Sequence, residues 1–215
     1  MTMSTFLQLL GRKEGGLVPY LQYQNNSLLE EAAALAADVD AALPWAQAAF
    51  GTPPEATNLW IGDERSVTSW HRDPYENIYC VVAGEKVFEL RPPADVWCAR
   101  LERHPVGRYA AAEAAQGGDP GAQLARLERL NLRLKPVEPP RFVIPPPLLR
   151  VTVRAGETLY LPAHWWHSVA QRPGPAGRVV AVNYWHDARL DARYASACLA
   201  ARLSERLGLN EGAEE

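Results

Sequence analysis

The feature that most constrains this chain is the division of its short β-type runs into two blocks. Runs of four to eight residues, rich in β-branched and aromatic side chains and bounded by glycine or proline, are typical of strands. Four such runs lie in each block, so the sequence predicts a mainly β chain. The predicted strands cover residues 58–61, 66–70, 78–82, 87–90, 150–153, 158–161, 167–170 and 179–185.

We expect one domain with three parts. A chain of 215 residues can bury most of its apolar surface in a single core. Residues 1–56 supply an N-terminal strand and a helix that lead into the β-structure. Residues 57–189 hold the β-structure, with an insertion over 92–147. Residues 190–215 form a C-terminal helix followed by a disordered tail.

Two helices are predicted outside the β-blocks. Residues 27–49 place apolar side chains at three- and four-residue steps, from Leu28 to Val39, with Pro44 near the end. Residues 190–207 show a similar spacing. This second helix suits either a cover over the barrel or the interface of a homodimer, and the sequence leaves both open.

The insertion over 92–147 is rich in proline and holds few large apolar residues. An Ala-, Gln-, Arg- and Leu-rich stretch over 109–134 predicts one or two helices within it. Because the insertion cannot build its own core, we expect a lid or a docking surface rather than a second domain.

Charge and cysteine content narrow the classes of partner. The chain has 22 Lys and Arg against 25 Asp and Glu, with a net charge of -3. This balance lacks the basic character that phosphate-backbone binding requires, so a nucleic-acid partner is disfavoured. The three cysteines form no CxxC pair, which favours a reducing compartment. No stretch is apolar enough for a signal peptide or a membrane span. We expect a cytoplasmic protein, with the nucleus as a second location.

The tripeptide His71-Arg72-Asp73 carries the strongest chemical signal. Residues i and i+2 of a strand project to the same face, so His71 and Asp73 can reach one ion. His167 follows a later turn and strand that would return it across the barrel. Two imidazoles and one carboxylate form the facial set that leaves three positions of a six-coordinate iron open. An isolated HxD motif is weak evidence, however, and needs a second observation.

Lys86 supplies that second observation. It shares strand parity with Phe88 and Leu90, so it faces the core if they do. A buried ammonium without a partner is very costly. The core therefore contains either an acidic partner or a site for an anionic ligand. Asn183 raises a similar question in the last strand, where a purely structural amide is an equal alternative.

These residues lie in segments that resemble the iron and 2-oxoglutarate core of the jumonji-C (JmjC) hydroxylases. The segments are VTSWHRDPYENIYCVVAGEK over 67–86, VRAGETLYLPAHWWH over 153–167 and VAVNYW over 180–185. The resemblance implies a double-stranded β-helix, the cupin-like jelly roll, with flanking α-helices. Family members carry a longer region before the equivalent of Thr5, so we expect an N-terminally shortened form.

The resemblance also assigns roles to individual residues. It implies that His71, Asp73 and His167 bind Fe(II) and that Lys86 pairs with the distal carboxylate of 2-oxoglutarate. Supporting contacts around the cosubstrate are implied for Tyr20, Thr68, Asn77 and Asn183. In a regular strand Thr68 and His71 would point to opposite faces, because they are three residues apart. Thr68 can therefore reach the cosubstrate only through a bulge or a strong twist. No catalytic acid or base is expected beyond the metal centre.

The implied activity is that of a dioxygenase, which uses O2 to hydroxylate a protein side chain and releases succinate and CO2. The similarity is greatest to a lysyl hydroxylase of this family, so we expect lysine of a translation-associated GTP-binding protein as the substrate. Alternatives within the family are an asparaginyl or arginyl hydroxylase, a histone lysine demethylase and a tRNA-modifying enzyme. Two others are a catalytically silent cupin binding module and a metal-dependent cupin that never uses 2-oxoglutarate. We expect Tyr75, Trp166 and Trp185 to line the substrate channel.

Overall fold

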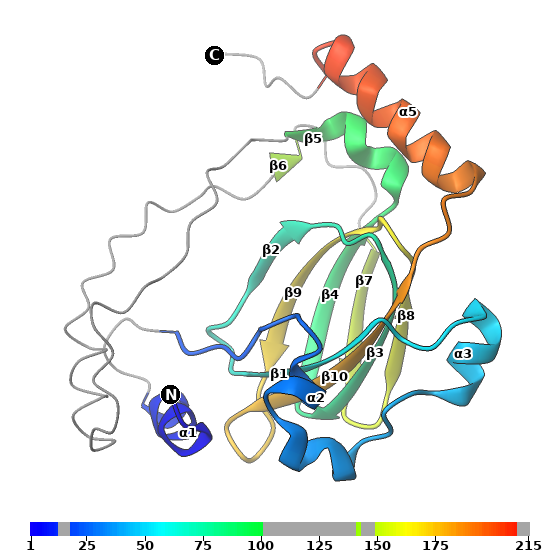
Figure 1. Ribbon diagram of the computed structural model, residues 1–215. Coiled ribbons are helices and arrows are strands. Elements are labelled where there is room, and N and C mark those ends of the chain that lie inside the picture. The colour runs from blue at the N-terminus through cyan, green and yellow to red at the C-terminus, as the bar shows by residue number, and fades with distance from the viewer. Residues whose placement is uncertain (13–17, 101–140, 143–148, 210–215) are drawn as a thin grey trace, which may run out of the picture.

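The computed structural model describes residues 1–12, 18–100, 141–142 and 149–209 (Figure 1). Its centre is a pair of facing, four-stranded antiparallel sheets. The first sheet has the order β1-β10-β3-β8, and the second has the order β2-β9-β4-β7. The first comprises β1 (Ala56–Gly62), β10 (Val179–Asp187), β3 (Tyr75–Ala83) and β8 (Thr158–Leu161). The second comprises β2 (Thr68–His71), β9 (Trp166–Arg172), β4 (Glu85–Arg91) and β7 (Leu149–Arg154).

All eight predicted strands are present, and their arrangement confirms the double-stranded β-helix. Strands from the two sequence blocks alternate in each sheet, so β10 lies between β1 and β3 while β9 lies between β2 and β4. This interleaving explains why neither block could fold alone, since each strand of one block hydrogen-bonds to strands of the other. It also brings residues from distant segments to the same end of the barrel.

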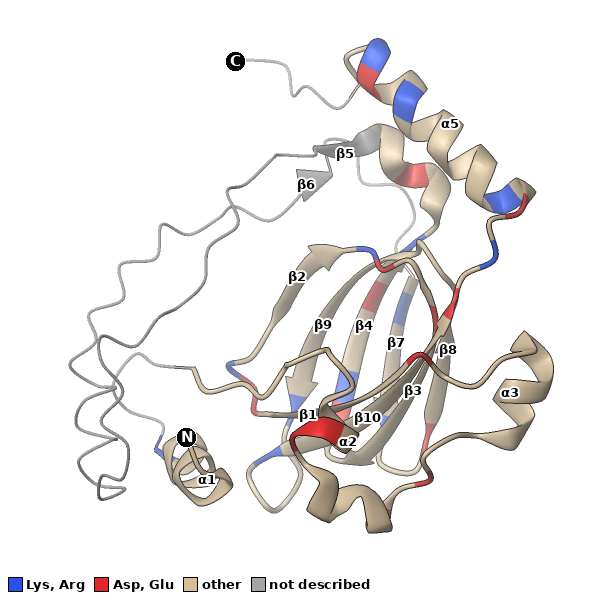
Figure 2. Ribbon diagram, viewed as in Figure 1, with Lys and Arg blue, Asp and Glu red and all other residues tan. Residues whose placement is uncertain are grey.

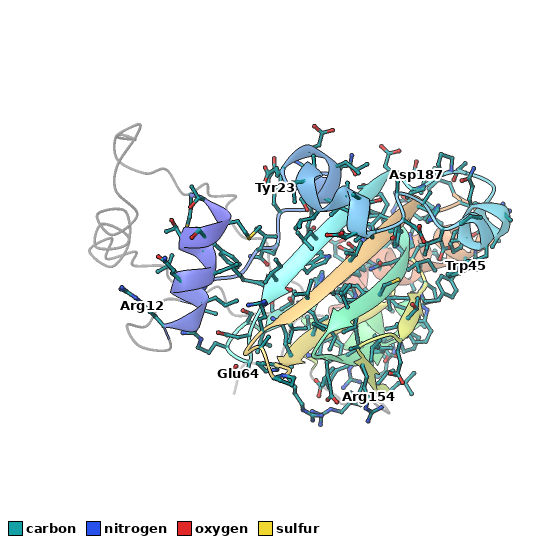
Figure 3. The ribbon with its side chains drawn as sticks, turned by 90° about the horizontal axis from the view of Figure 1, so that it is seen from below. Arg12, Tyr23, Trp45, Glu64, Arg154 and Asp187 are labelled. Carbon is teal, nitrogen blue, oxygen red and sulfur yellow. The ribbon has the colours of Figure 1, made fainter. Side chains whose placement is uncertain are left out.

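The first sheet is buried on both faces. Its inner face meets the second sheet in a core that includes Trp60, Tyr79, Phe88 and Val169. Its outer face carries a second core, which joins side chains of β1, β3 and β10 to the N-terminal helices. The view from below shows these helices against the sheet, with side chains filling the space between the two sheets (Figure 3). This double burial explains why every residue of β1 after Ala56 is buried, whichever face its side chain is on.

The predicted N-terminal strand is wrong, because the chain begins with a helix, α1 (Met3–Gly11). The side chain of Thr2 caps it by accepting a hydrogen bond from the amide of Thr5, an arrangement that satisfies one of the free amides of the first turn. Among the described residues before β1, Leu21 forms an isolated antiparallel β-bridge with Ile61 of β1.

The single helix predicted over 27–49 is also wrong. The structure has three short helices there: α2 (Ser27–Glu30), the 3-10 helix η1 (Ala33–Asp38) and α3 (Pro44–Phe50). Proline disfavours helical backbone at the residue before it but fits the first turn of a helix, whose amides are free. Pro44 therefore starts α3 instead of closing an earlier helix.

The insertion begins with the 3-10 helix η2 (Pro93–Cys98) and the short strand β5 (Ala99–Arg100), which pairs with β6 (Arg141–Phe142). The helices predicted over 109–134 lie outside the described residues. The described start of the insertion packs against the C-terminal helix, since Val96 of η2 is fully buried beside Trp166 and two alanines of that helix.

The C-terminal helix α5 (Ala192–Arg206) is confirmed, and Asp191 caps its first turn. It contacts the barrel side through small residues, Ala200 and Ala201, which allow a close approach to Trp166. Larger apolar residues of this segment, on which the helix prediction rests, are exposed, with Leu199 58% and Leu207 68% accessible to solvent. No helix among the described residues has the length and apolar character to span a membrane. Figure 2 shows acidic and basic residues interspersed along the elements that it colours.

Candidate metal and cosubstrate site

All three predicted metal ligands lie close together in the barrel. His71 ends β2, His167 is the second residue of β9, and the two are directly paired in the strand ladder. Asp73 lies in the turn after β2. Nε2 of His71 is 3.7 Å from Oδ2 of Asp73, and Nε2 of His167 is 3.6 Å from the same oxygen. The three donor atoms all lie within 4.8 Å of one another.

Backbone contacts orient both imidazoles. Nδ1 of His71 lies 2.7 Å from the carbonyl oxygen of Ser69, and Nδ1 of His167 lies 3.0 Å from that of Trp165. These carbonyls can only accept, so each Nδ1 carries the proton and each Nε2 is left with its lone pair toward the shared centre. The side chain of His167 is only 5% exposed. Burial, aided by neighbouring His71, lowers the pKa of His167 to about 3, so this ring is neutral, the form that binds metals.

The donor set fits a divalent transition metal. Two imidazoles and a carboxylate on one face are the ligand set typical of non-haem Fe(II), and they leave the opposite face open to other ligands. Burial raises the pKa of Asp73, while the neighbouring His71 lowers it. A metal cation between His71, Asp73 and His167 would supply a positive charge that favours the ionised carboxylate of Asp73. His71, Asp73 and His167 are therefore the residues that would hold such a metal.

Lys86 lies at the closed end of the barrel and is fully buried, as its strand parity predicted. Its Nζ donates to the hydroxyl of Tyr20 at 3.2 Å and lies 5.2 Å from the Tyr20 ring centroid and 5.9 Å from that of Tyr79. Burial lowers the pKa of Lys86 to about 7. Within the described residues no carboxylate pairs with Lys86, so its buried amine is available to an anionic ligand.

Tyr20 and not Tyr23 contacts Lys86. The ring of Tyr20 lines the pocket that also contains the metal-ligand residues, whereas Tyr23 is 51% exposed and its hydroxyl accepts from Asn25. Burial raises the pKa of Tyr20 to about 12, although a hydrogen bond with Thr68 lowers it. Tyr20 therefore stays a neutral hydrogen-bonding group between Lys86 and the pocket.

Thr68 reaches the same face as His71 through a bulge. Thr68 pairs with Val169 and His71 pairs with His167, so β2 has two intervening residues where β9 has one. An extra residue in one strand reverses the parity beyond it. This finding resolves the parity conflict of the sequence and places Thr68 among the residues that line the pocket.

A chain of amides forms the wall of the pocket on the first sheet. Asn183 on β10 accepts a hydrogen bond from the indole of Trp60 at 2.8 Å, and its own amide donates to Asn77 on β3 at 3.0 Å. Both asparagines are buried and line the pocket. The structure thus brings together every polar residue that the sequence analysis selected for the cosubstrate. Strand parity could have identified further lining residues that the analysis missed, namely Trp60, Tyr79, Phe88 and Val169.

The three aromatic residues expected in the substrate channel have different environments. Trp185 lines the pocket, and Tyr75 stacks on it with ring centroids 4.6 Å apart and planes 9° apart. Trp166 does not line this pocket. It is buried between η2 and α5, with the guanidinium of Arg72 5.1 Å from its ring centroid. Its strand parity opposes that of His167, so it faces away from the barrel interior.

A second, larger cavity of about 360 Å³ lies beneath α5. Its wall combines the first turns of α5 with the turn before β9 and the start of the insertion. Glu76 lines this cavity, and its carboxylate accepts hydrogen bonds from the Tyr160 hydroxyl at 2.7 Å and the Ala163 amide at 3.1 Å. This cavity is separate from the pocket of the metal ligands.

Comparison with known proteins agrees with this geometry. Residues 1–192 match the family model described as a cupin-like domain. The chain is 37% identical over 216 residues to the human bifunctional peptidase and (3S)-lysyl hydroxylase JMJD7, with 98% of this chain and 66% of that protein covered. It is 40% identical over 200 residues to lysine-specific demethylase JMJ32 of Arabidopsis thaliana, covering 85% and 56%. JmjC domain-containing protein E of Dictyostelium discoideum is 36% identical, with 83% and 56% covered. The chain thus spans 56% to 66% of the length of these relatives.

Proposed function

Because this chain belongs to the cupin-like domain family, and within it to the JmjC proteins, we propose that it is an Fe(II)- and 2-oxoglutarate-dependent dioxygenase that hydroxylates a protein side chain. The observation that carries the proposal is the shared location of two features. A His-Asp-His metal triad opens onto the pocket at one end, and a fully buried lysine without a carboxylate partner among the described residues lies behind its other end.

Each feature has a defined part in this activity. The triad would hold Fe(II), and the iron with 2-oxoglutarate and O2 supplies the oxidising chemistry that releases succinate and CO2. Tyr20 and Lys86 would bind the distal carboxylate of 2-oxoglutarate. Tyr20 lines the pocket and its hydroxyl accepts from Lys86, so the two side chains would act together on that carboxylate. Thr68, Asn77 and Asn183 would orient the cosubstrate through hydrogen bonds and need no proton transfer.

We further propose lysine as the substrate residue, in a protein such as a translation-associated GTPase. The relative named as a lysyl hydroxylase aligns with nearly the whole chain. The stacked Tyr75 and Trp185 also present aromatic surface beside the pocket, which suits a lysine side chain through its apolar stem and its cation. The second candidate is demethylation of methyl-lysine, which the 40% identity to a protein named as a demethylase supports.

An anaerobic titration tests the proposed chemistry. Purified protein receives Fe(II) and then 2-oxoglutarate, and the weak visible charge-transfer band of the chelate is recorded. We expect a band that requires both additions and is absent in His71→Ala and Lys86→Ala. A metal-dependent cupin that does not use 2-oxoglutarate would bind Fe(II) in both the wild type and Lys86→Ala without the band. Folded wild-type protein that binds neither would identify a silent binding module.

Mass spectrometry separates the two candidate reactions. Matched peptides with lysine or trimethyl-lysine at one position are incubated with the enzyme, Fe(II), 2-oxoglutarate and O2. Hydroxylation adds one oxygen atom to the unmodified peptide, whereas demethylation removes one carbon unit from the methylated peptide and releases formaldehyde. Turnover of the methylated peptide alone would contradict the lysyl-hydroxylase proposal.

A further inference from the structure

A buried amide at the closed end of the barrel has one of its two polar atoms unpaired. Gln171 on β9 is 4% exposed, and its Nε2 donates to the carbonyl of Ser66 at 2.9 Å. Its Oε1 is buried and has no hydrogen-bond partner among the described residues. Buried acceptors in proteins are nearly always paired, so this oxygen calls for a donor.

Lys86 is the residue of β4 that pairs with Gln171 in the strand ladder. Lys86 of β4 and Gln171 of β9 are directly paired, which places their side chains on the same face with neighbouring Cβ atoms. Gly62 gives a second reference point. A Cβ built on Gly62 would lie 2.8 Å from Nε2 of Gln171 and 2.8 Å from Cδ2 of Tyr20, the tyrosine whose hydroxyl accepts from Lys86. Gln171, Tyr20 and Lys86 therefore surround one small volume.

The amide of Gln171 has a determined orientation. A backbone carbonyl can only accept, so the nitrogen and not the oxygen must face Ser66. Ser66 precedes β2, and β9 lies between β2 and β4 in the second sheet. The nitrogen is thus directed to the β2 side, and the oxygen on the opposite side of the amide is directed to β4, the strand of Lys86.

We propose that Gln171 is a positioning residue whose amide oxygen accepts a hydrogen bond from the Lys86 ammonium when 2-oxoglutarate is bound. The proposal rests on the proposed function, since it requires the cosubstrate carboxylate at Lys86. An ammonium has three N–H donors. Tyr20 accepts one, the carboxylate accepts the second, and Gln171 accepts the third. Full satisfaction of the donors keeps the buried lysine charged and aimed at the carboxylate.

Few other titratable groups in the part of the chain that the structure describes contact Lys86 and could change its charge. Among the described residues, the titratable side chains found in contact with Lys86 are the phenols of Tyr20, from the N-terminal segment, and Tyr79, from β3. Burial raises the pKa of both, to about 12 for Tyr20, and proximity to Tyr20 adds to the increase at Tyr79. Both are neutral below pH 9. The metal ligands lie at the other end of the pocket.

The test uses Gln171→Met, which removes the acceptor, and Gln171→Glu, which keeps the size and adds a negative charge. Gln47→Met, at an exposed position on α3, is the matched control. Calorimetry measures 2-oxoglutarate binding to Zn(II)-loaded protein. The chain has three lysines, Lys13, Lys86 and Lys135, so 13C-labelled lysine gives a resolved titration of Lys86 in the complex, assigned with Lys86→Arg.

We expect Gln171→Met to weaken 2-oxoglutarate binding by about tenfold, the loss of one charge-assisted hydrogen bond, and to lower the pKa of Lys86 in the complex. Gln171→Glu should also weaken binding, because it repels the carboxylate, but should raise that pKa. A purely structural role would not shift the pKa in opposite directions. Zn(II) affinity should stay unchanged in both variants.

The outcomes separate this inference from the proposed function. Wild-type protein that binds Zn(II) but not 2-oxoglutarate would overturn the cosubstrate site itself. Wild-type binding with unchanged affinity and unchanged Lys86 titration in the variants would overturn only the role of Gln171, and would indicate a bound water as the partner of its oxygen. If Gln171→Met does not fold, Gln171→Asn replaces it, because the shorter side chain withdraws the amide oxygen from Lys86. The same weaker binding and lower Lys86 pKa are then expected, and unchanged values would overturn the role of Gln171.

Discussion

The hydroxyl of Tyr20 lies 3.2 Å from Nζ of Lys86, although Tyr20 precedes the first strand of the barrel and Lys86 lies within β4. This contact joins the N-terminal segment to the second sheet at the closed end of the pocket. Tyr20 offers a hydroxyl but no negative charge, because burial raises its pKa to about 12. Since no described residue offers Lys86 a carboxylate, we expect cosubstrate binding to depend on the charge of this lysine.

The affinity for 2-oxoglutarate should fall as the pH rises above about 7. Burial lowers the pKa of Lys86 to about 7 in the free protein, and the bound carboxylate raises it again. Binding must therefore take up a proton above pH 7, whereas below pH 7 the lysine is already charged and affinity should be constant. Calorimetry from pH 6 to 9, in two buffers of different ionisation enthalpy, measures both effects. Lys86→Arg should bind more weakly and without this pH dependence, and a flat wild-type profile would contradict the prediction.

Lys86→Met should stabilise the protein without its cosubstrate while abolishing 2-oxoglutarate binding. Because the folded-state pKa of Lys86 lies below its unfolded value, the unfolded state binds more protons, and wild-type stability rises between pH 7 and 10.5. The gain from Met should therefore be largest at or below pH 7, roughly 2–4 kcal/mol in the free energy of unfolding, and should shrink toward pH 10.5. Urea unfolding at pH 6.5 and pH 10 tests this, and a variant less stable than wild type at pH 6.5 would refute it.

Metal binding should stabilise the wild type and not Asp73→Ala. Asp73 is the carboxylate that lies beside both histidines, and its removal leaves two imidazoles and no anionic group of the triad to hold a divalent cation. At a hundredfold excess of Mn(II) over the dissociation constant, the free energy of unfolding of the wild type should rise by about 2.7 kcal/mol. Chelator should reverse this increase. Equal stabilisation of Asp73→Ala would place the bound metal elsewhere.

Gly62→Ala should weaken the cosubstrate site and spare the metal site. A Cβ at this position would lie 2.8 Å from both Cδ2 of Tyr20 and Nε2 of Gln171 and 2.9 Å from Oγ of Ser66, so the side chains around Lys86 must shift. We expect a several-fold larger dissociation constant for 2-oxoglutarate, by calorimetry on Mn(II)-loaded protein, with Mn(II) affinity unchanged. Gly11→Ala on α1 is the control, because a Cβ there meets nothing within 4 Å. Unchanged 2-oxoglutarate binding would show that the Tyr20 position is not critical.

Much of the barrel was predictable because each strand is encoded locally. Alternation and β-branched runs identified all eight strands, and strand parity predicted that Lys86 faces the core. The helices were less predictable. The run from Leu28 to Val39 has helical spacing, but hydrogen bonds between Ser27 and β1 and the backbone restriction imposed by Pro44 divide it into short pieces. Tertiary contacts of this kind are not visible as periodicity.

By itself, the sequence selected the candidate metal ligands through residue type and the resemblance of their segments to the JmjC family, and it selected the lysine through strand parity and the same resemblance. Only the tertiary structure decided which residues act together. In the structure His71 pairs with His167, and a bulge places Thr68 on the same face as these two residues. Tyr20, and not Tyr23, contacts Lys86. Trp166 lies outside the pocket. The physical reason is that a strand's parity follows from its own residues, whereas register, bulges and layer packing depend on the neighbouring strand, which lies far away in the chain.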